Sequence, residues 1–321
     1  MALYQRFKRQ ILSKVVLVRI ALITLSICLI AILYFLAIKP LSRLTASLPN
    51  HAGRTNFLLL GVAGGDHEGK DLTDTIIFAS IDTNTGDTAL ISIPRDLWVP
   101  SIRAKINTAY HYGEERQPGI GGFLLAKSSL TEAIGQPVDF VVLIDFSGFA
   151  KAIDAIGGLD IQVDSSFTDS KFPIPGKETD PCEPCRYETI SFSQGLQHMD
   201  GATALKFVRS RQAVGDEGTD FARSKRQEKL ISAFKQKILT SPTKIFKLKQ
   251  ILSEVVVTDI SSSFYFPLSK LGLKAVRQPI RTFSLSEPML THPSISASQD
   301  YQWVLLANPD ITKYVDSLLH P

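Results

Sequence analysis

A long stretch without charge near the N-terminus constrains this chain more than any other feature. Residues 20–38, IALITLSICLIAILYFLAI, contain no Asp, Glu, Lys or Arg. A helix of this length rises about 28 Å, close to the thickness of the hydrocarbon core of a bilayer. Five basic residues precede the stretch and two follow it closely, so the positive-inside rule places the N-terminus in the cytoplasm. The sequence therefore predicts a single-pass protein of the cell membrane whose main part lies outside the cytoplasm.

A cleaved signal peptide is the alternative interpretation of this stretch. Its apolar region would be unusually long, and no small-x-small cleavage site follows directly. We therefore expect a retained anchor. The expected parts are a basic cytoplasmic tail at 1–14, a transmembrane helix at 15–38, a polar spacer at 39–55 and one extracytoplasmic domain at 56–321.

The net charge of +4 is misleading because it comes from the N-terminal region. The first 50 residues hold seven Lys or Arg and no acid, which leaves 28 basic and 31 acidic residues in the rest of the chain. A domain with a balance of about −3 lacks the positive charge that general nucleic-acid binding requires. Nucleic acid is therefore excluded as the main partner.

Short apolar segments alternate with helical ones along the outer part of the chain. Apolar runs bounded by turn residues predict strands, and longer periodic segments predict helices. Strands that alternate with helices favour a layered α/β fold. We expect strands at 56–62, 75–82, 88–93 and 137–145, and helices at 119–134, 146–156, 200–211 and 220–239.

Cys182 and Cys185 lie in the Pro-rich segment DPCEPC. An outward-facing pair meets an oxidising space, which favours a local disulfide, with unpaired thiols or a metal site as alternatives. Zinc needs four ligands, and the sequence has no second pair of this kind. The flanking prolines favour a loop over the helix that a thioredoxin-type site opens.

A Gly-rich acidic loop, GVAGGDHEGKDLTDT, follows the first predicted strand. Residues 64–70 approximate a phosphate-binding loop, but Asp71 stands where that loop needs Ser or Thr. An outward-facing domain also meets no cytoplasmic nucleotide. Carboxylate oxygens suit a hard cation such as Mg²⁺, and a solvated acidic turn is the alternative.

Arginines follow in three later segments, ISIPRD, ALKFVRSR and DFARSKRQ. Arg223 and Gln227 are one helical turn apart and share a face of the predicted helix. A guanidinium group binds phosphate oxygens in a bidentate way. One arginine alone is more often a surface charge. Several arginines together, beside an acidic loop that could bind a metal ion, suit a pyrophosphate. The candidate set comprises Arg95, Arg209, Arg211, Arg223, Arg226 and Gln227.

Eight segments in order make the outer part of the chain similar to the LytR–CpsA–Psr family of bacterial envelope proteins. They are LLLG, DLTDTIIF, ISIPRD, KINTAY, PVDFVVLIDFSGF, AIDAIGGLDIQV, QGLQHMDGATALKFVRSR and DFARSKRQ. The resemblance implies an α/β/α layered domain with a central mixed sheet, preceded by one transmembrane helix. It also implies a phosphotransferase that moves a glycopolymer from a polyprenyl-pyrophosphate carrier to peptidoglycan, through a phosphodiester bond and with Mg²⁺ as cofactor.

The resemblance assigns roles to single residues. Asp74 would be a magnesium ligand, and the pyrophosphate would bind to Arg95, Arg209, Arg211, Arg223 and Gln227. Family members often read G-x-D after the first strand, where this chain has Val62-Ala63. The other metal carboxylate is then expected from Asp66, Glu68 or Asp71, with Asp66 as the first candidate.

A second departure is Leu72, which stands where many family members carry an arginine, so one pyrophosphate contact is either missing or supplied by Lys70. At the chemical step we expect Arg95 to neutralise charge. Asp96 or Asp220 would position or deprotonate the attacking sugar hydroxyl, which in this family's proposed role is the muramic acid 6-hydroxyl. The alternatives are a polyprenyl-pyrophosphate hydrolase and a non-catalytic binder of lipid-linked glycans.

Overall fold

The computed structural model describes residues 47–65, 69–177, 179–241 and 243–321. The predicted tail and transmembrane helix lie outside these ranges, so both stay predictions. Within the described ranges, no helix combines the length and the apolarity that a membrane span requires. Pro49–Ile260 and Leu271–Pro321 form one compact unit, whereas Ser261–Lys270 belongs to a separate one.

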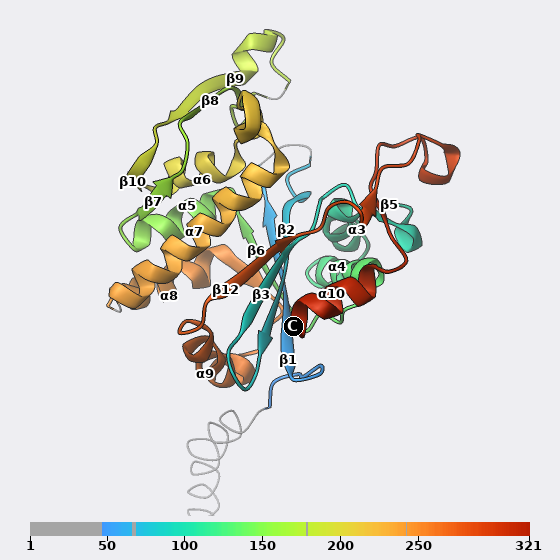
Figure 1. Ribbon diagram of the computed structural model, residues 1–321, viewed down its shortest axis with the longest axis vertical. Coiled ribbons are helices and arrows are strands. Elements are labelled where there is room, and N and C mark those ends of the chain that lie inside the picture. The colour runs from blue at the N-terminus through green and yellow to red at the C-terminus, as the bar shows by residue number, and fades with distance from the viewer. Residues whose placement is uncertain (1–46, 66–68, 178, 242) are drawn as a thin grey trace, which may run out of the picture. The chain divides into compact units, whose positions relative to one another are not determined.

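A six-stranded mixed sheet forms the centre of the larger unit (Figure 1). Its strands are β1 (Arg54–Val62), β2 (Thr73–Asp82), β3 (Thr88–Ser92), β6 (Phe140–Asp145), β11 (Val256–Thr258) and β12 (Ile280–Ser284). Their order is β11–β6–β1–β2–β3–β12. β1 pairs parallel with β6 and β3 parallel with β12, and the other neighbours are antiparallel. The predicted α/β fold with a mixed central sheet is thereby confirmed.

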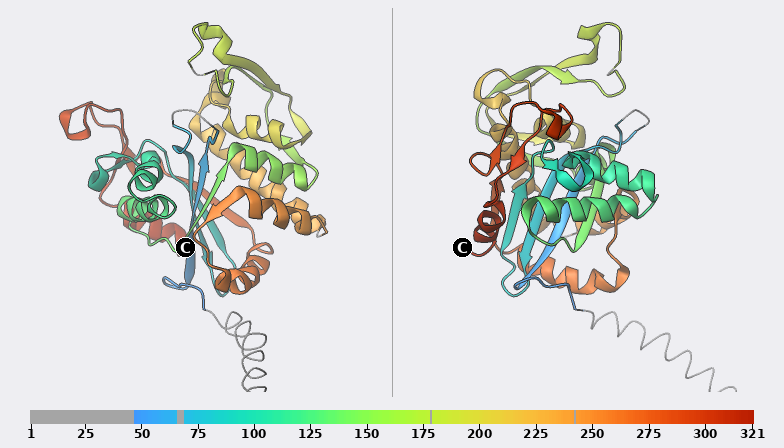
Figure 2. Two further views of the ribbon diagram at one scale, coloured as in Figure 1. Left: turned by 180° about the vertical axis from the view of Figure 1, so that it is seen from behind. Right: turned by 90° about the vertical axis from the view of Figure 1, so that its right-hand side faces the viewer.

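Helices cover both faces of this sheet (Figure 2). One face carries α3 (Ala109–Arg116), α4 (Gly121–Ile134) and α10 (Ile311–Leu319). The opposite side carries α5 (Phe146–Ala155), α6 (Gly201–Arg209), α7 (Asp220–Thr240) and α8 (Lys244–Val255). The remaining α-helix in the described ranges is α9 (Tyr265–Ala275).

Four two-stranded sheets surround this framework. They are β4 (Trp98–Val99) with β5 (Ala104–Lys105), β7 (Leu159–Val163) with β10 (Gly195–Met199), β8 (Phe167–Pro173) with β9 (Tyr187–Phe192), and β13 (Leu290–Thr291) with β14 (Leu306–Ala307). The 3₁₀ turns are η2 (Pro100–Ile102), η3 (Ile106–Thr108), η4 (Glu183–Arg186), η5 (Gly215–Gly218), η6 (Ser262–Phe264) and η7 (Ala297–Gln299). Cys182, directly before η4, and Cys185, within it, form a disulfide, which was the favoured of the three predicted states of this pair.

Polar side chains cap the helices that carry the candidate site. Asp200 accepts a hydrogen bond from Thr203 N at 2.8 Å and begins α6, as predicted. Asp145 accepts from Gly148 N at 2.6 Å and begins α5. The prediction that α6 continues to residue 211 is wrong, because Ser210 turns out of the helix with ψ 131°. Arg211 therefore lies in a loop.

Two separate hydrophobic cores form on the two sides of the sheet. Leu58, Leu60 and Phe78 belong to the first core, which they share with α4 and α10. The second core lies within the α5–α8 layer and its hairpins, around residues such as Phe207. Among the described residues, no side chain of the central sheet belongs to the second core. Because alternate residues of a strand face opposite ways, the second face of the sheet is free to line a cavity.

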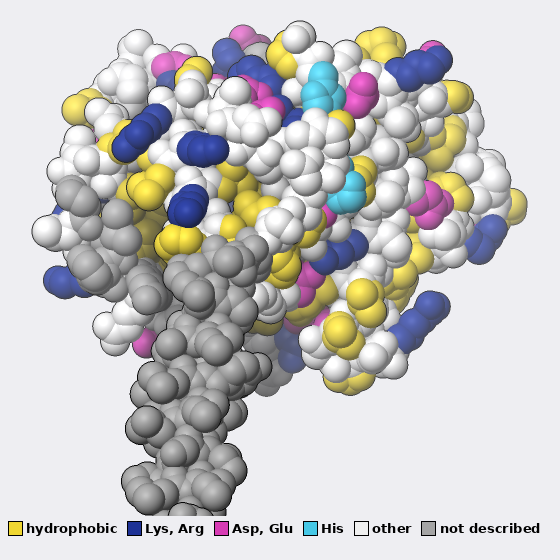
Figure 3. All heavy atoms as spheres, turned by 90° about the horizontal axis from the view of Figure 1, so that it is seen from below, with side chains coloured by type: hydrophobic (Ala, Val, Ile, Leu, Met, Phe, Trp, Pro, Cys, Tyr) yellow, Lys and Arg dark blue, Asp and Glu magenta, His cyan; other side chains and the backbone are white. Residues whose placement is uncertain are grey.

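The face of the molecule seen from below is mixed in character. Figure 3 shows the view from below, in which hydrophobic side chains form separate patches with lysines and arginines between them. Isolated exposed apolar side chains are normal on a protein surface. We therefore place no site on this face.

Candidate functional site

A cavity of about 260 Å³ brings together the arginines that the sequence singled out. We call it the arginine pocket. It is lined by Asp74, Thr75, Arg95, Phe146, Asp169, Lys171, Pro173, Tyr187, Val208, Arg209, Arg211, Gln212, Arg223 and Gln227. All five predicted pyrophosphate ligands are among these residues, together with the predicted metal ligand Asp74. They come from β2, the loop after β3, the end of α6, the loop that follows α6 and the first turns of α7.

Arg95 and Asp74 form a direct ion pair at one side of this pocket. Arg95 Nη1 donates to Asp74 Oδ1 at 2.6 Å, and both side chains are 37% exposed. Burial alone would lower the pKa of Arg95, but the hydrogen bond to Asp74 and the charges of Asp74 and Asp96 outweigh burial and raise that pKa. Arg95 Nε is buried without a hydrogen-bond partner among the described residues, and Asp96 Oδ2 lies too far away at 3.6 Å. A phosphate oxygen would satisfy this donor.

Aromatic rings orient Arg209, the last residue of α6. Its guanidinium carbon lies 3.9 Å from the ring centroid of Phe146 and 5.5 Å from that of Phe172. Stacking on aromatic faces is a contact that a planar guanidinium makes well, and lysine makes it less well. The rings therefore fix the direction of the Arg209 charge within the pocket.

Asp169 on β8 holds the loop that carries Arg211, although the sequence did not single it out. Its Oδ2 accepts from Ser210 Oγ at 2.7 Å, Arg211 N at 3.2 Å and Gln212 N at 3.1 Å. The residue is only 1% exposed. A buried carboxylate must be hydrogen-bonded, and here the partners are the segment that turns out of α6. The signal in the sequence was a lone acid at an inward position of an alternating strand.

A second cavity, also of about 260 Å³, lies between the free face of the sheet and the α5–α7 layer. We call it the apolar slot. Its walls are almost entirely hydrophobic, and it is lined by Leu59, Leu60, Gly61, Thr75, Ile77, Val142, Ile144, Asp145, Phe146, Phe149, Leu205, Val208, Arg209, Gln227, Leu230 and Ile231. Thr75, Phe146, Val208, Arg209 and Gln227 line the arginine pocket as well. The cationic arginine pocket and the apolar slot are therefore adjacent, and these five residues form the wall between them.

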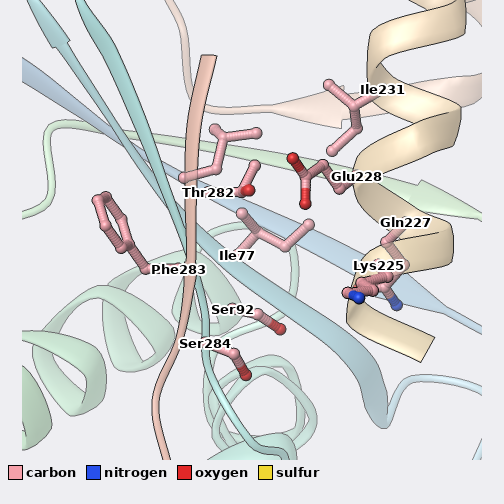
Figure 4. Close-up of a pocket in the computed structure, with 10 residues that line it drawn as sticks. Ile77, Ser92, Lys225, Gln227, Glu228, Ile231, Thr282, Phe283 and Ser284 are labelled. Atoms are coloured by element: carbon pink, nitrogen blue, oxygen red, sulfur yellow. The ribbon is translucent and has the colours of Figure 1, made fainter. Parts of the chain in front are cut away.

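A smaller side cavity of about 230 Å³ lies beyond Ile77 and Ile231, toward the edge strand β12. Figure 4 shows Ser92, Thr282 and Ser284 of the sheet on one side and Lys225, Gln227 and Glu228 of α7 on the other. It shares Ile77, Gln227 and Ile231 with the apolar slot. The space between the sheet and α7 thus changes from apolar to partly polar as it approaches β12.

Comparison with known proteins identifies the family to which this chain belongs. The sequence model of the LytR_cpsA_psr family matches residues 38–308. The chain belongs to the LytR_cpsA_psr family.

Two curated relatives of this family member are named as peptidoglycan teichoic acid transferases. TagU of Oceanobacillus iheyensis is 32% identical over 64% of the chain and 58% of the relative. TagV of Bacillus subtilis is 27% identical over 72% of the chain and 56% of the relative. The chain thus spans a little over half the length of these relatives. The crystal structure of B. subtilis TagV has a TM-score of 0.59 at 22% identity, covering 84% of this chain and 98% of that one, which shows a shared fold.

Within the LytR_cpsA_psr motif R-x-x-R-Q, the structure separates the two arginines of α7. Arg223 lines the arginine pocket, as predicted from the resemblance. Arg226 is only 3% exposed and donates to Ser210 O at 2.7 Å and to Glu217 Oε2 at 2.8 Å. Burial lowers the pKa of Arg226, an effect that Glu217 partly offsets. Arg226 is therefore a structural residue that joins α7 to the loop after α6.

The structure locates only one of the two side chains predicted for proton transfer, Asp96 and Asp220. Asp96 does not line the arginine pocket, and its carboxylate contacts Lys105 Nζ at 2.7 Å. Asp220 is the first residue of α7, but its side chain lies outside the described part of the structure. Their roles in catalysis stay predictions.

The predicted Mg²⁺ ligands lie at the start of β2 and in the segment that precedes it. Asp66 and Glu68 lie outside the described residues. The loop before them passes close to Asp145, because a Cβ on Gly64 (φ +69°) would lie 2.9 Å from Asp145 Cβ. Asp74 presents its carboxylate in the arginine pocket, and Mg²⁺ often takes one or two carboxylates together with substrate phosphates. The donor set therefore fits Mg²⁺ if the substrate supplies phosphate oxygens.

Another cluster of metal-ligating residue types in the described ranges is Asp180, Cys182 and Cys185. Because the two cysteines are joined in a disulfide, they offer no thiolate. We therefore interpret this cluster as a disulfide that stabilises the β8–β9 hairpin.

Proposed function

We propose that this protein transfers a glycopolymer from a polyprenyl-pyrophosphate carrier to peptidoglycan and so forms a phosphodiester bond. The arginine pocket and the apolar slot, joined through a common wall, carry the proposal. A polyprenyl pyrophosphate has an anionic head directly attached to an apolar tail, and the two cavities match these two parts in the same order. The names of the TagU and TagV relatives support the same reaction class.

The arginines bind the pyrophosphate and stabilise the charge that develops on the leaving phosphate. Arg95, Arg209 and Arg211 are placed to contact non-bridging oxygens, because guanidinium groups bind phosphate in a bidentate way. The acceptor hydroxyl oxygen bonds to the phosphorus that carries the glycan. The bridging P–O bond then breaks, and polyprenyl phosphate leaves with the bond's electron pair. Asp96 or Asp220 positions the hydroxyl and accepts its proton.

Asp74 would hold Mg²⁺ together with oxygens of the pyrophosphate, and Asp66 is the proposed second carboxylate. When bound, the ion supplies a positive charge next to the phosphates, which favours departure of the leaving group. Arg95 holds Asp74 in place through their 2.6 Å hydrogen bond.

The proposed location follows from the substrate. A polyprenyl carrier stays in the membrane, so a site that acts on its head group works close to the bilayer surface. A retained helix at 15–38 with a cytoplasmic N-terminus would hold the domain at the outer face of the cell membrane.

The test uses the full chain in detergent with a short-chain polyprenyl-pyrophosphoryl glycan and peptidoglycan fragments, with and without Mg²⁺. We expect polyprenyl phosphate and a glycan–peptidoglycan phosphodiester to form only with the metal. Arg95→Ala and Arg209→Ala should each lower turnover by roughly 10²–10³. Arg116→Ala, which removes an exposed arginine of α3, is the matched control and should leave turnover unchanged.

Product identity separates the proposal from its alternatives. Free glycan phosphate in place of the phosphodiester would identify a hydrolase. Binding of the donor without any release of polyprenyl phosphate would identify a non-catalytic binder.

A further inference from the structure

An exposed aromatic cluster lies beside Asp96, outside both cavities. Trp303 is 46% exposed and Tyr301 is 73% exposed. The ring of His292 meets the ring of Trp303 edge-on, with the centroids 4.7 Å apart. Aromatic side chains usually bury most of their large surface, so the exposed Trp303–His292 pair next to a polar site, with the exposed Tyr301 two positions earlier in the same loop, points to a ligand.

This cluster is tied to the strand segment that follows Arg95. Leu305 N donates to Asp96 O at 3.0 Å, and Trp98 N donates to Leu305 O at 2.8 Å. Lys105 Nζ lies 6.0 Å from the centroid of the Trp303 ring and 2.7 Å from Asp96 Oδ1. Asp96 in turn lies 3.6 Å from Arg95, which binds Asp74. A short chain of contacts thus connects the aromatic cluster to the arginine pocket.

The backbone of the cluster is held in an uncommon conformation. Asp300 and Tyr301 have φ values of +50° and +58°, and Arg103 in the neighbouring turn has +48°. Among the described residues other than glycine, only Ala52 shares a positive φ. Arg103 Nη2 bonds Asp300 Oδ1 at 2.5 Å and so joins the two turns. Left-handed residues of this kind are sustained by their surroundings and tend to occur at binding sites.

The cluster lies on the side of the sheet opposite the apolar slot. Leu97 and Val99, which flank Trp98, belong to the first core with α4 and α10. The loop around η7 extends on that side next to β5, whereas α5–α7 lie on the other (Figure 1). In an in-line displacement the attacking and leaving oxygens lie on opposite sides of phosphorus. If the lipid leaves toward the slot, the acceptor approaches from the side of Asp96 and Trp303.

We propose that Trp303, Tyr301, His292 and Lys105 form a subsite for a pyranose ring of the acceptor glycan strand, an inference that rests on the proposed function. A pyranose presents a face of C–H groups that packs against an aromatic ring, and its hydroxyl, amide and carboxylate oxygens accept hydrogen bonds. Lys105, whose Nζ lies over the Trp303 ring at 6.0 Å from its centroid, and His292, whose ring meets it edge-on, supply donors beside the ring. The subsite sets which sugar of the strand presents its hydroxyl beside Asp96.

The first test measures binding of the acceptor without any donor. The chain has two tryptophans, of which Trp98 is 7% exposed, so acrylamide quenching of fluorescence reports mainly on Trp303. A tetrasaccharide of alternating N-acetylglucosamine and N-acetylmuramic acid should protect Trp303 from acrylamide in the full chain. An oligomer of polyol phosphate, which has no pyranose face, should not. Protection by the polyol phosphate alone, or by neither probe, would overturn the assignment.

The second test measures the apparent KM for the acceptor in the transfer reaction. Trp303→Ala should raise it roughly ten- to thirtyfold, with the donor KM unchanged. Trp303→Phe should restore most of the affinity, and Tyr314→Ala, which removes a partly exposed tyrosine of α10, should change nothing. An acceptor KM within twofold of the native value in Trp303→Ala would contradict the subsite. If the native chain releases no polyprenyl phosphate at all, the proposed transfer fails, but saccharide protection of Trp303 would still establish the subsite.

Discussion

At the scale of single residues, neighbouring arginines of one motif serve different purposes. Arg223 and Arg226 are three positions apart on α7, but only Arg223 lines the arginine pocket. Arg226 is enclosed by Glu217, Ser210 and the ring of Phe167, whose centroid lies 4.8 Å from its guanidinium carbon. Charge and spacing alone do not separate them, and only the family resemblance assigned the pyrophosphate to Arg223 and not to Arg226.

Substituting each arginine by glutamine should expose this difference. Arg226→Gln leaves Glu217 and Ser210 O without their buried partner, so we expect a loss of about 3 kcal/mol and a fall in the unfolding midpoint of roughly 6–12 °C. Arg223→Gln should lower the midpoint far less but reduce turnover by roughly 10²–10³. Thermal unfolding and turnover, both measured on the full chain, check the pair. Equal losses of stability in the two variants would contradict the separation.

At the scale of secondary-structure elements, one carboxylate joins several strands at the end of the sheet away from the arginine pocket. Asp87 precedes β3 and accepts from Arg281 Nε of β12 at 2.9 Å and from Arg54 Nη1 of β1 at 3.1 Å. Arg281 also donates to Leu318 O of α10 at 2.5 Å. The edge strand β12 is therefore held to the sheet by charged hydrogen bonds as well as by its ladder.

The stabilising effect of Asp87 should depend on pH. Its hydrogen bond with Arg281, supported by Arg54 and opposed by burial, lowers its pKa in the folded state. A lowered folded-state pKa adds stability above the unfolded-state value of about 3.9, and this stability is lost as pH falls through the folded-state pKa. Asp87→Asn should therefore lower the unfolding midpoint at pH 7, and the difference from the native chain should shrink below about pH 4.

Unfolding midpoints between pH 3 and 7 check this expectation. Asp310→Asn, at an exposed carboxylate of the α10 N-terminus, is the control and should follow the native curve. A difference for Asp87→Asn that stays constant over this range would show that its charge does not matter.

Local signals in the sequence predicted most elements of the fold, and long-range contacts account for what they missed. Apolar runs identified β1, β2, β3 and β6, and the Asp200 cap identified the start of α6. The early end of α6 depends on Asp169, about 40 positions away, which accepts from Ser210 and from the backbone that follows. The position of Trp303 beside Asp96 depends on hydrogen bonds of Leu305 to strand residues about 200 positions earlier. No local pattern encodes such pairings.

At the scale of the whole molecule, one face of the sheet lines a cavity: none of the described side chains of the central sheet belongs to the second core, and several on that face line the apolar slot below α5–α7. The continuous apolar run at 56–62 predicted a buried strand, but Leu59 and Leu60 are equally apolar in sequence. Only the structure shows that Leu60 packs in the first core and also borders the apolar slot, whereas Leu59 and Val142 line the slot without belonging to that core. The five residues expected to bind pyrophosphate were predicted from a resemblance, whereas the slot residues could not be distinguished from ordinary core.

A larger side chain in the apolar slot should weaken the binding of donors with a long lipid more than that of donors with a short one. Val142→Phe places a larger side chain in the slot, so we expect the apparent KM for a long-chain polyprenyl donor to rise roughly tenfold, since each excluded CH₂ loses about 0.8 kcal/mol. A donor with only two isoprene units should be affected less. Kinetics with both donors check this, and Val257→Phe at an exposed position of β11 is the control. Equal effects on the two donors would show that the tail does not occupy the slot.

The shared wall between the arginine pocket and the apolar slot also has a kinetic consequence. Cleavage of the pyrophosphate separates the glycan from the carrier, but the carrier keeps its entire tail and one phosphate. Both would still be held, the tail by the slot and the phosphate by Arg209 and its neighbours. We therefore expect polyprenyl phosphate to be a strong product inhibitor. Release of polyprenyl phosphate from the slot into the bilayer, which dissolves its tail, would then limit the rate of repeated turnover.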